Sequence, residues 1–202
     1  MKSVLQRWRT ASLRKRYGHS FANATSYFKA DPARLKRIRD YTDHDYIDIN
    51  TALLMGRQAA EKKIGAAKAD AIWLKKAKLQ KDLADAPKLP GMVYRGTYMP
   101  VDNVSRMISE GKTYAKNFWS TSRDLATAVS YAHNRPGDKL GKNETRVVFH
   151  VDQRSGVDVS GVSAEGGFGI AEKETLIAPG AQFKVVRADQ RGAEQHIFLV
   201  EV

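Results

Sequence analysis

The hydrophobic period of the chain changes once, near Pro87 and Pro90, and this change limits the folds open to it. Before the two prolines, apolar residues recur every three or four positions among Ala, Lys and other polar residues, which is typical of amphipathic helices. After them, short apolar runs are separated by turn residues, as in β-strands. Helices followed by strands predict an α+β domain with a mostly antiparallel sheet, rather than a βαβ nucleotide-binding fold.

Helices are predicted in three stretches of the first part. Asp31 and Pro32 supply the cap and the first position of a helix that runs to Tyr41. A second helix is predicted to follow directly and to end at Gly56, and residues 57–83 are predicted to be further helix. We interpret the lysines of 57–83 as a solvated face, with a nucleic-acid patch as the alternative.

Strands are predicted in the second part, where β-branched and aromatic residues cluster between turn residues. The predicted strands are 92–95, 118–122, 146–151, 175–177, 182–186 and 196–200. The chain contains no internal repeat, so these strands are expected to form one domain together with the helices.

Positive charge is concentrated at the N-terminus. Seven Lys and Arg of the net charge of +12 lie in residues 1–30, which contain no acid. This segment is either an anchor for nucleic acid, an anionic surface or an acidic partner, or a solvated terminus, and its composition also resembles a targeting or secretion leader. We expect a basic leader over 1–30 and a domain over 31–202, with a helical part at 31–88 and a β-rich part at 89–202.

Several classes of protein are excluded by composition. The absence of cysteine removes disulfide scaffolds, thiolate zinc sites, iron–sulfur clusters and cysteine nucleophiles. The five histidines are scattered singly, so no histidine metal site is expected. Gly166 to Gly169 is not followed by the Lys-Ser/Thr of a phosphate-binding loop. No apolar stretch approaches the length of a membrane helix, and the protein is therefore expected to be soluble.

Two short motifs on predicted strands carry groups that suit a ligand. In Tyr94-Arg95-Gly96 the guanidinium can clasp a pyrophosphate, and the glycine lets a ligand approach the backbone. A structural salt bridge is the alternative role for Arg95. Ser120-Thr121-Ser122 places its two serine hydroxyls on one face of a strand, which by itself is ordinary β-strand chemistry.

A third motif, Glu172-Lys173-Glu174, places two carboxylates at the start of a predicted strand. On an extended strand both would project to the same side, and two like charges there are costly unless a cation or a hydrogen-bond donor lies beside them. We therefore expect a functional site here. Paired carboxylates can also cleave sugars, but catalytic acids that oppose each other across a sugar normally lie further apart.

Together, an aromatic-Arg-Gly strand, a Ser-Thr-Ser strand and a Glu-x-Glu strand in this order resemble the Arg-Ser-Glu class of mono-ADP-ribosyltransferases. That class includes clostridial actin-modifying toxins and T-even phage transferases. The resemblance extends upstream to residues 41–50 and downstream to residue 183. The other class of these enzymes has His where this chain has Arg95 and is disfavoured. The resemblance implies the ADP-ribosyltransferase fold, in which N-terminal helices pack on a mostly antiparallel two-sheet β core, with NAD as substrate and no metal.

The resemblance also implies a role for each motif residue. Arg95 would hold the NAD pyrophosphate, and Gly96 would offer backbone groups to the nicotinamide amide. Ser120 would orient Glu174, and Glu174 would bind the 2′-hydroxyl of the nicotinamide ribose and stabilise positive charge as the glycosidic bond breaks. Glu172 would meet the incoming nucleophile, and in this family a Glu at that position marks enzymes that modify arginine.

Two aromatic residues are further candidates. Tyr131 falls where the family often has an aromatic residue that packs on nicotinamide, and a core tyrosine on a helix starting near Asp124 is the alternative. Phe168 lies in the loop before Glu172, a loop that often touches the protein target in this family. An exposed aromatic side chain there would suit an interface anchor.

The sequence therefore predicts an enzyme that transfers ADP-ribose from NAD to an arginine of a host or target-cell protein and releases nicotinamide. We expect a bacterial effector, toxin or phage protein that acts in the cytoplasm of another cell after secretion or injection. Two alternatives remain open, a glycohydrolase that uses water as the acceptor, and a non-enzymatic basic protein that binds nucleic acid.

Overall fold

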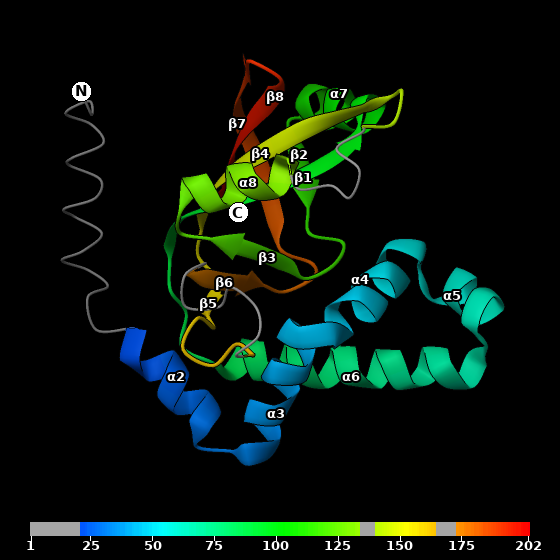
Figure 1. The fold of residues 1–202 in the computed structure, drawn as a ribbon, viewed down its shortest axis with the longest axis vertical. Helices are drawn as coiled ribbons and strands as arrows, with labels where there is room; N and C mark the ends of the chain where they lie inside the picture. Colours follow the sequence, from blue (N-terminus) through cyan, green and yellow to red (C-terminus); the bar gives the residue numbers. More distant parts are fainter. Residues whose placement is uncertain (1–20, 134–139, 165–172) are drawn as a thin grey trace.

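The structure, a computed structural model, describes residues 21–133, 140–164 and 173–202. As predicted, helices come first and strands follow (Figure 1). The helical part contains α2 (Phe21–Lys29), α3 (Pro32–Asp40), the π-helix η1 (Tyr41–Asp45), α4 (Tyr46–Met55), α5 (Arg57–Ile64) and α6 (Ala66–Asp85). The remaining elements are β1 (Gly91–Pro100), α7 (Val101–Glu110), β2 (Lys112–Tyr114), β3 (Trp119–Ser122), α8 (Leu125–His133), β4 (Glu144–Gln153), β5 (Val157–Asp158), β6 (Glu174–Ile177), β7 (Gln182–Arg191) and β8 (Glu194–Glu201).

Local signals determine where the helices begin and end. The Asp31 carboxylate accepts hydrogen bonds from the backbone N–H of Ala33 and Arg34, at 2.8 and 3.2 Å, and so caps α3 as predicted. The predicted long helix over 57–83 is divided into α5 and α6, because Gly65 has a φ of +86° and interrupts the helical backbone.

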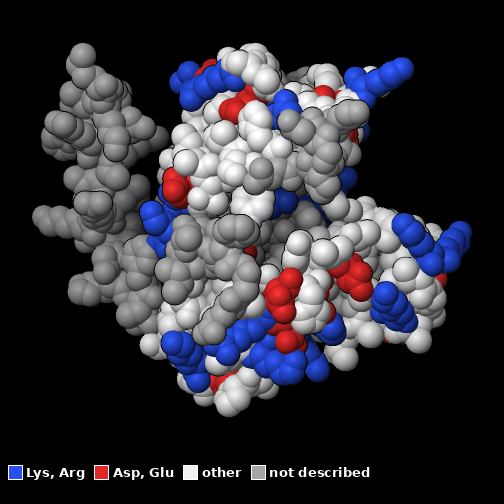
Figure 2. All heavy atoms as spheres, in the orientation of Figure 1, with Lys and Arg blue, Asp and Glu red and all other residues white. Residues whose placement is uncertain are grey.

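The lysines of α6 face solvent, which agrees with the solvated-face interpretation. Lys75 pairs with Asp45 at 2.8 Å, and Lys68 pairs with Asp48 at 3.5 Å. In Figure 2, basic and acidic side chains alternate over the visible face of the helical part. Within the described ranges, none of the helices combines the length and the apolar character needed to cross a membrane.

The strands pair in the order β2-β7-β8-β4-β1-β3-β6-β5. Among the described strands, every pair is antiparallel except β4 with β8, so the predicted α+β class with a mostly antiparallel sheet is confirmed. The expected division into two sheets is not seen in the hydrogen bonding. A single residue pair, Tyr94 with Ser122, joins β1 to β3 and makes the ladder continuous.

Two hydrophobic cores lie on either side of β3 and β6. Phe118 and Leu176 are buried with the helices in one core, whereas their neighbours Trp119 and Ile177 are buried with β1, β4, β7 and β8 in the other. Side chains alternate across a strand, so consecutive residues serve opposite cores. The two strands that carry the Ser-Thr-Ser and Glu-x-Glu motifs are therefore fixed from both sides.

The N-terminal helix α2 packs on the same body. Ala24 and Phe28 are buried in the helix-side core. A Cβ at Gly161 would come within 2.3 Å of the Thr25 hydroxyl, which shows how closely α2 approaches the turn after β5. The first 20 residues of the predicted leader lie outside the described residues, and the boundary at residue 30 stays a prediction.

Candidate active site

The Ser-Thr-Ser and Glu-x-Glu motifs meet through the pairing of β3 with β6. Their register places Ser122 opposite Glu174 and Ser120 opposite Leu176, so Ser120 and Glu174 are diagonal neighbours on one face. The Ser120 hydroxyl donates a hydrogen bond to Oε1 of Glu174. Below them, the Thr121 hydroxyl donates to the carbonyl of Thr175 at 2.6 Å and holds the two strands together.

Glu174 is a buried carboxylate, with 8% of the residue exposed. Its second oxygen, Oε2, accepts a hydrogen bond of 3.0 Å from the hydroxyl of Ser163. A buried charge is costly unless it is hydrogen-bonded, and here each carboxylate oxygen has a hydroxyl donor. The carboxylate is thereby held in one orientation.

The Arg-Gly motif on β1 reaches the same place. Nη1 of Arg95 donates to the backbone carbonyl of Ser120 at 2.7 Å, and the guanidinium carbon lies 6.0 Å from the centre of the Trp119 ring. Burial lowers the pKa of Arg95 below its usual value, but an arginine remains charged at neutral pH. Arg95, Ser120 and Glu174 thus form one cluster, although they come from three strands.

A groove of about 1380 Å³ opens beside this cluster. It is larger than the roughly 300–1,000 Å³ of ordinary small-molecule pockets. Trp119 forms part of its wall, stacked on Phe149 and Phe183 at centroid distances of 5.2 and 5.1 Å. Polar and cationic lining residues include Arg95, Thr97, Asn103, Arg106, Lys116 and Asn117. The groove can accommodate an extended anionic ligand.

Gly96 has a packing role that the sequence did not reveal. A Cβ at this position would lie 1.6 Å from the carbonyl oxygen of Ala128 and 2.7 Å from the backbone nitrogen of Ala132. Only glycine lets α8 approach β1 so closely. The predicted contact of its backbone with nicotinamide stays a prediction.

Tyr131 lies on α8 with 48% of the residue exposed. This exposure excludes the core position that was the alternative role for this tyrosine. Its packing on nicotinamide remains a prediction.

The residue between the two glutamates is not extended. Lys173 has a φ of +49°, in the left-handed region that side chains other than glycine rarely adopt. Its carbonyl accepts from the backbone N–H of Arg123 at 3.3 Å, and Arg123 is paired with the buried Asp158 at 3.1 Å. The argument that both carboxylates project to one side requires an extended Lys173, so it does not hold. Glu172 and Phe168 lie outside the described residues.

Helical residues also reach the cluster. Asn50 donates from Nδ2 to the Tyr41 hydroxyl and accepts from the backbone N–H of Phe118, both at 3.1 Å. Burial raises the pKa of Tyr41, and the nearby charge of Glu174 raises it further, against opposing effects of Asn50 and Arg95. Tyr41 and Asn50 are in the stretch that carries the family resemblance, which was the available signal.

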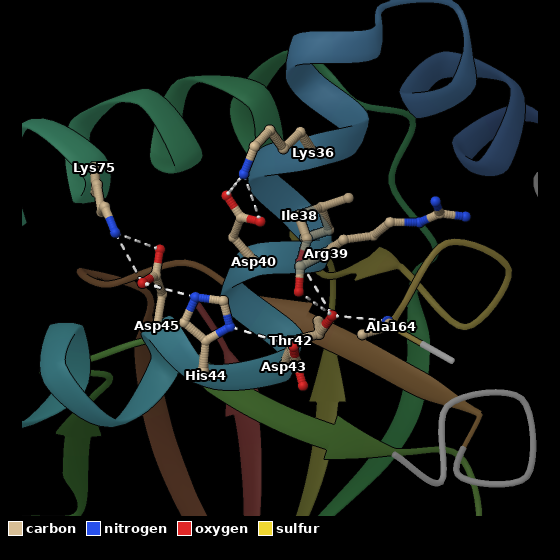
Figure 3. A network of polar contacts seen from close by, with 10 residues as sticks. All are labelled: Lys36, Ile38, Arg39, Asp40, Thr42, Asp43, His44, Asp45, Lys75 and Ala164. Atoms are coloured by element: carbon tan, nitrogen blue, oxygen red, sulfur yellow. Dashed lines mark hydrogen bonds and ion pairs between the residues drawn. The ribbon is translucent and has the colours of Figure 1, made fainter. Parts of the chain in front are cut away.

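Figure 3 shows the polar contacts made by the π-helix η1 and its neighbours. The Thr42 hydroxyl accepts from the backbone N–H of Ala164 at 3.1 Å and lies 3.0 Å from the carbonyl of Ile38. Asp45 on the same turn is paired with Lys75 of α6. No sequence signal pointed to Ser163, and Thr42 was marked only by its place in residues 41–50, because both act through contacts between distant segments. In the described part of the chain, no group of three or more His, Asp or Glu side chains could hold a metal ion.

Comparisons with known proteins agree with this geometry. The profile of the family described as NAD:arginine ADP-ribosyltransferase matches residues 7–202. No curated protein sequence is similar enough to count as a relative.

Solved structures of bacterial enzymes share the fold. The Vis toxin, an ADP-ribosyltransferase from Vibrio splendidus, is 21% identical with a TM-score of 0.71, over 98% of this chain and 86% of that one. Exoenzyme S from Pseudomonas aeruginosa, solved with a human 14-3-3 protein and carba-NAD, is 22% identical with a TM-score of 0.60, over 97% and 88%. The ADP-ribosyltransferase HopU1 of Pseudomonas syringae is 19% identical with a TM-score of 0.61, over 94% and 85%.

Proposed function

Since the chain belongs to the NAD:arginine ADP-ribosyltransferase family, we propose that it moves a single ADP-ribose from NAD to an arginine of a target protein and releases nicotinamide. The observation that carries the proposal is the convergence of Arg95, Ser120 and Glu174 beside a groove large enough for a dinucleotide.

NAD binding is assigned to the groove and to Arg95. The bond to Ser120 uses one of the five N–H donors of the guanidinium, and we assign other donors of the same planar group to the diphosphate. The Gly96 backbone and the Tyr131 ring are assigned to the nicotinamide end. Trp119, stacked with the rings of Phe149 and Phe183, supplies a rigid wall against which Arg95 is held.

Bond cleavage is assigned to Glu174. As the bond between C1′ of the ribose and the nicotinamide nitrogen breaks, the electron pair leaves with nicotinamide and positive charge develops on the ribose. A carboxylate already oriented by Ser120 stabilises that charge without reorganising, and it accepts a hydrogen bond from the 2′-hydroxyl. Ser120 acts as a positioning residue in this step.

Transfer is assigned to Glu172. A nitrogen of the acceptor guanidinium forms the new bond to C1′ and gives up a proton, which the Glu172 carboxylate takes. A guanidinium with a pKa above about 12 is a poor nucleophile, so a carboxylate that orients it and accepts its proton suits this step. Phe168, in the same loop by sequence, is assigned to contact with the target protein.

The structural neighbours favour action on another cell's proteins. One of them is a toxin, and another was solved in complex with a human 14-3-3 protein. We therefore assign this chain to the toxins and effectors that act in the cytoplasm of a host or target cell. The reaction as proposed needs only NAD and an acceptor protein.

A two-activity assay tests the proposal. Nicotinamide release and label from radioactive NAD on an arginine-rich acceptor are measured for the wild type and for Glu172→Gln. We expect transfer to arginine to be lost in Glu172→Gln while slow release of nicotinamide to water continues. Equal loss of both activities, or wild-type label on Asn, Ser or Thr, would contradict the arginine assignment. Nicotinamide release that is independent of acceptor would favour the glycohydrolase alternative.

A further inference from the structure

We propose that Ser163 is a second positioning residue for Glu174, which holds Oε2 of the carboxylate as Ser120 holds Oε1. The proposal rests on the proposed function for its kinetic consequences. The structural contact itself, from the Ser163 hydroxyl to Oε2 at 3.0 Å, stands independently of them.

The turn after β5 places Ser163 firmly. β5 pairs with β6 at Val157–Leu176 and Asp158–Thr175, and the backbone N–H of Val159 donates to the carbonyl of Glu174 at 3.1 Å. The turn then closes with a bond of 2.9 Å from the N–H of Ser163 to the carbonyl of Val159. The segment that carries Ser163 is therefore attached to the strand that carries Glu174.

The single proton of the Ser163 hydroxyl has two acceptors within reach, the Val159 carbonyl at 2.9 Å and Oε2 of Glu174 at 3.0 Å. The Val159 carbonyl already accepts the N–H groups of Val162 and Ser163, which occupy both of its lone pairs. A carboxylate is also the stronger acceptor, because its hydrogen bonds are charge-assisted. The proton therefore belongs to Glu174.

The π-helix η1 holds Ala164, the residue that follows Ser163. Thr42 accepts from the N–H of Ala164, so Ser163 is fixed by its own turn on one side and by η1 on the other (Figure 3). Thr42 makes this contact from a segment 122 residues away. We assign Thr42 a supporting role that acts through Ser163.

Steady-state kinetics of nicotinamide release test the inference with four single variants and one double variant. Ser163→Ala should lower kcat about tenfold and leave the KM for NAD nearly unchanged, because Glu174 acts mainly in bond cleavage. Ser163→Thr keeps a hydroxyl and should restore most of kcat. Ser160→Ala is the matched control, since this serine bonds to Asp158 on the same turn and should behave as wild type. Thr42→Val should lower kcat less than Ser163→Ala, with no further loss when the two are combined.

A wild-type kcat for Ser163→Ala, an equal loss in Ser160→Ala, or no rescue by Thr would overturn the proposal. Crystal structures of the wild type and Ser163→Ala provide a test that does not need activity. In Ser163→Ala the Glu174 carboxylate should rotate or occupy two rotamers, and an unmoved carboxylate would also overturn the proposal. A wild type that releases no nicotinamide would instead contradict the proposed function, and the crystal structures would still decide the role of Ser163.

Discussion

The helical part, α2 to α6, and the strand part, β1 to β8 with α7 and α8, are held together in different ways. In the helical part, apolar faces meet in one core, and ion pairs such as Lys75–Asp45 lie at the surface. In the strand part, β1 pairs with β4 from Gly91–Gln153 to Pro100–Glu144, and stacked rings fill the other core. Backbone bonds on both sides fix a strand residue, so small changes there should have larger consequences.

The residues of the candidate site are divided between the strand part and the helical part. Arg95, Ser120 and Glu174 come from strands, whereas Tyr41, Thr42 and Asn50 reach toward them from the helical part. The strands therefore carry the candidate catalytic residues, and the helices support the orientation of those side chains. The predictions below test this division, starting with the largest expected effect.

Glu174→Gln should lower kcat by about 10²- to 10³-fold, because it removes the charge that stabilises the developing cation. Its unfolding free energy should stay close to that of the wild type, since Gln has nearly the same shape. The measurements are nicotinamide release and urea denaturation. Activity near the wild-type level in a folded variant would contradict the assignment of chemistry to β6.

Gly96→Ala should destabilise the fold by about 3 kcal/mol, because the new methyl group would meet the backbone of α8 at Ala128. Backbone atoms cannot move aside as a flexible side chain can. Denaturant unfolding measures the loss, and Gly141→Ala is a control, since a Cβ there meets mainly the flexible Glu144 side chain. An unchanged midpoint for Gly96→Ala would mean that α8 is not tightly seated on β1.

Stability should depend on pH through His150, which is buried in the strand part. Burial, together with the nearby His196 and Arg191, lowers the pKa of His150 to about 4 from an unfolded value of 6.5. The unfolded chain therefore binds a proton that the folded chain rejects, and stability should fall as pH drops from about 6.5 to about 4.

The expected loss is about 3 kcal/mol, since each pKa unit between the unfolded and folded values corresponds to about 1.4 kcal/mol. Denaturation at a series of pH values measures it. His150→Phe should reduce the dependence, whereas His44→Gln, at an exposed position of η1, should follow the wild type. Equal pH dependence of the unfolding free energy in all three proteins would show that His150 does not cause it.

Arg95→Lys should raise the KM for NAD about tenfold with a smaller change in kcat, because an ammonium group cannot form the planar fork of a guanidinium. Titration calorimetry with NAD checks the binding directly. Unchanged NAD affinity would show that the groove binds the dinucleotide without this residue.

Lys75→Met should change the unfolding free energy by less than about 1 kcal/mol, since an exposed lysine pairs weakly even with the less exposed Asp45. A small change in the unfolding free energy is what we expect for exposed ion pairs on the surface of the helical part. Chemical denaturation at low and high salt measures it, and a loss as large as that of Gly96→Ala would remove the distinction between the two parts.

Much of the fold could be predicted from local patterns. The change of period at Pro87 and Pro90, the cap at Asp31 and the turn residues between strands placed several helices and strands. The helices α2 and α7 were not predicted, and β1 and β7 continue beyond their predicted ends at residues 95 and 186 to Pro100 and Arg191. The missed elements include β2 and β5, which are three and two residues long and too short to show alternation. The interruption at Gly65 was missed because one glycine within an amphipathic pattern is compatible with a continuous helix.

The site could be predicted where its residues belong to motifs. Arg95, Ser120 and Glu174 were identified in this way, and the structure brings them into contact. Ser163 and the left-handed Lys173 could not be predicted, because their environment is set by segments that meet only in the folded protein. The predicted projection of Glu172 assumed regular strand geometry, and Lys173 departs from it.

The parallel pairing of β4 with β8 has a consequence for the order of assembly during synthesis. β8 is the last of the described strands in sequence order, yet it lies inside the sheet, between β7 and β4. Until residues 194–201 emerge from the ribosome, the facing edges of β4 and β7 have no neighbour. Exposed strand edges are templates for aggregation. A polypeptide truncated before Glu194 should therefore be recognised by chaperones and proteases as incomplete, although every candidate catalytic residue has already been translated.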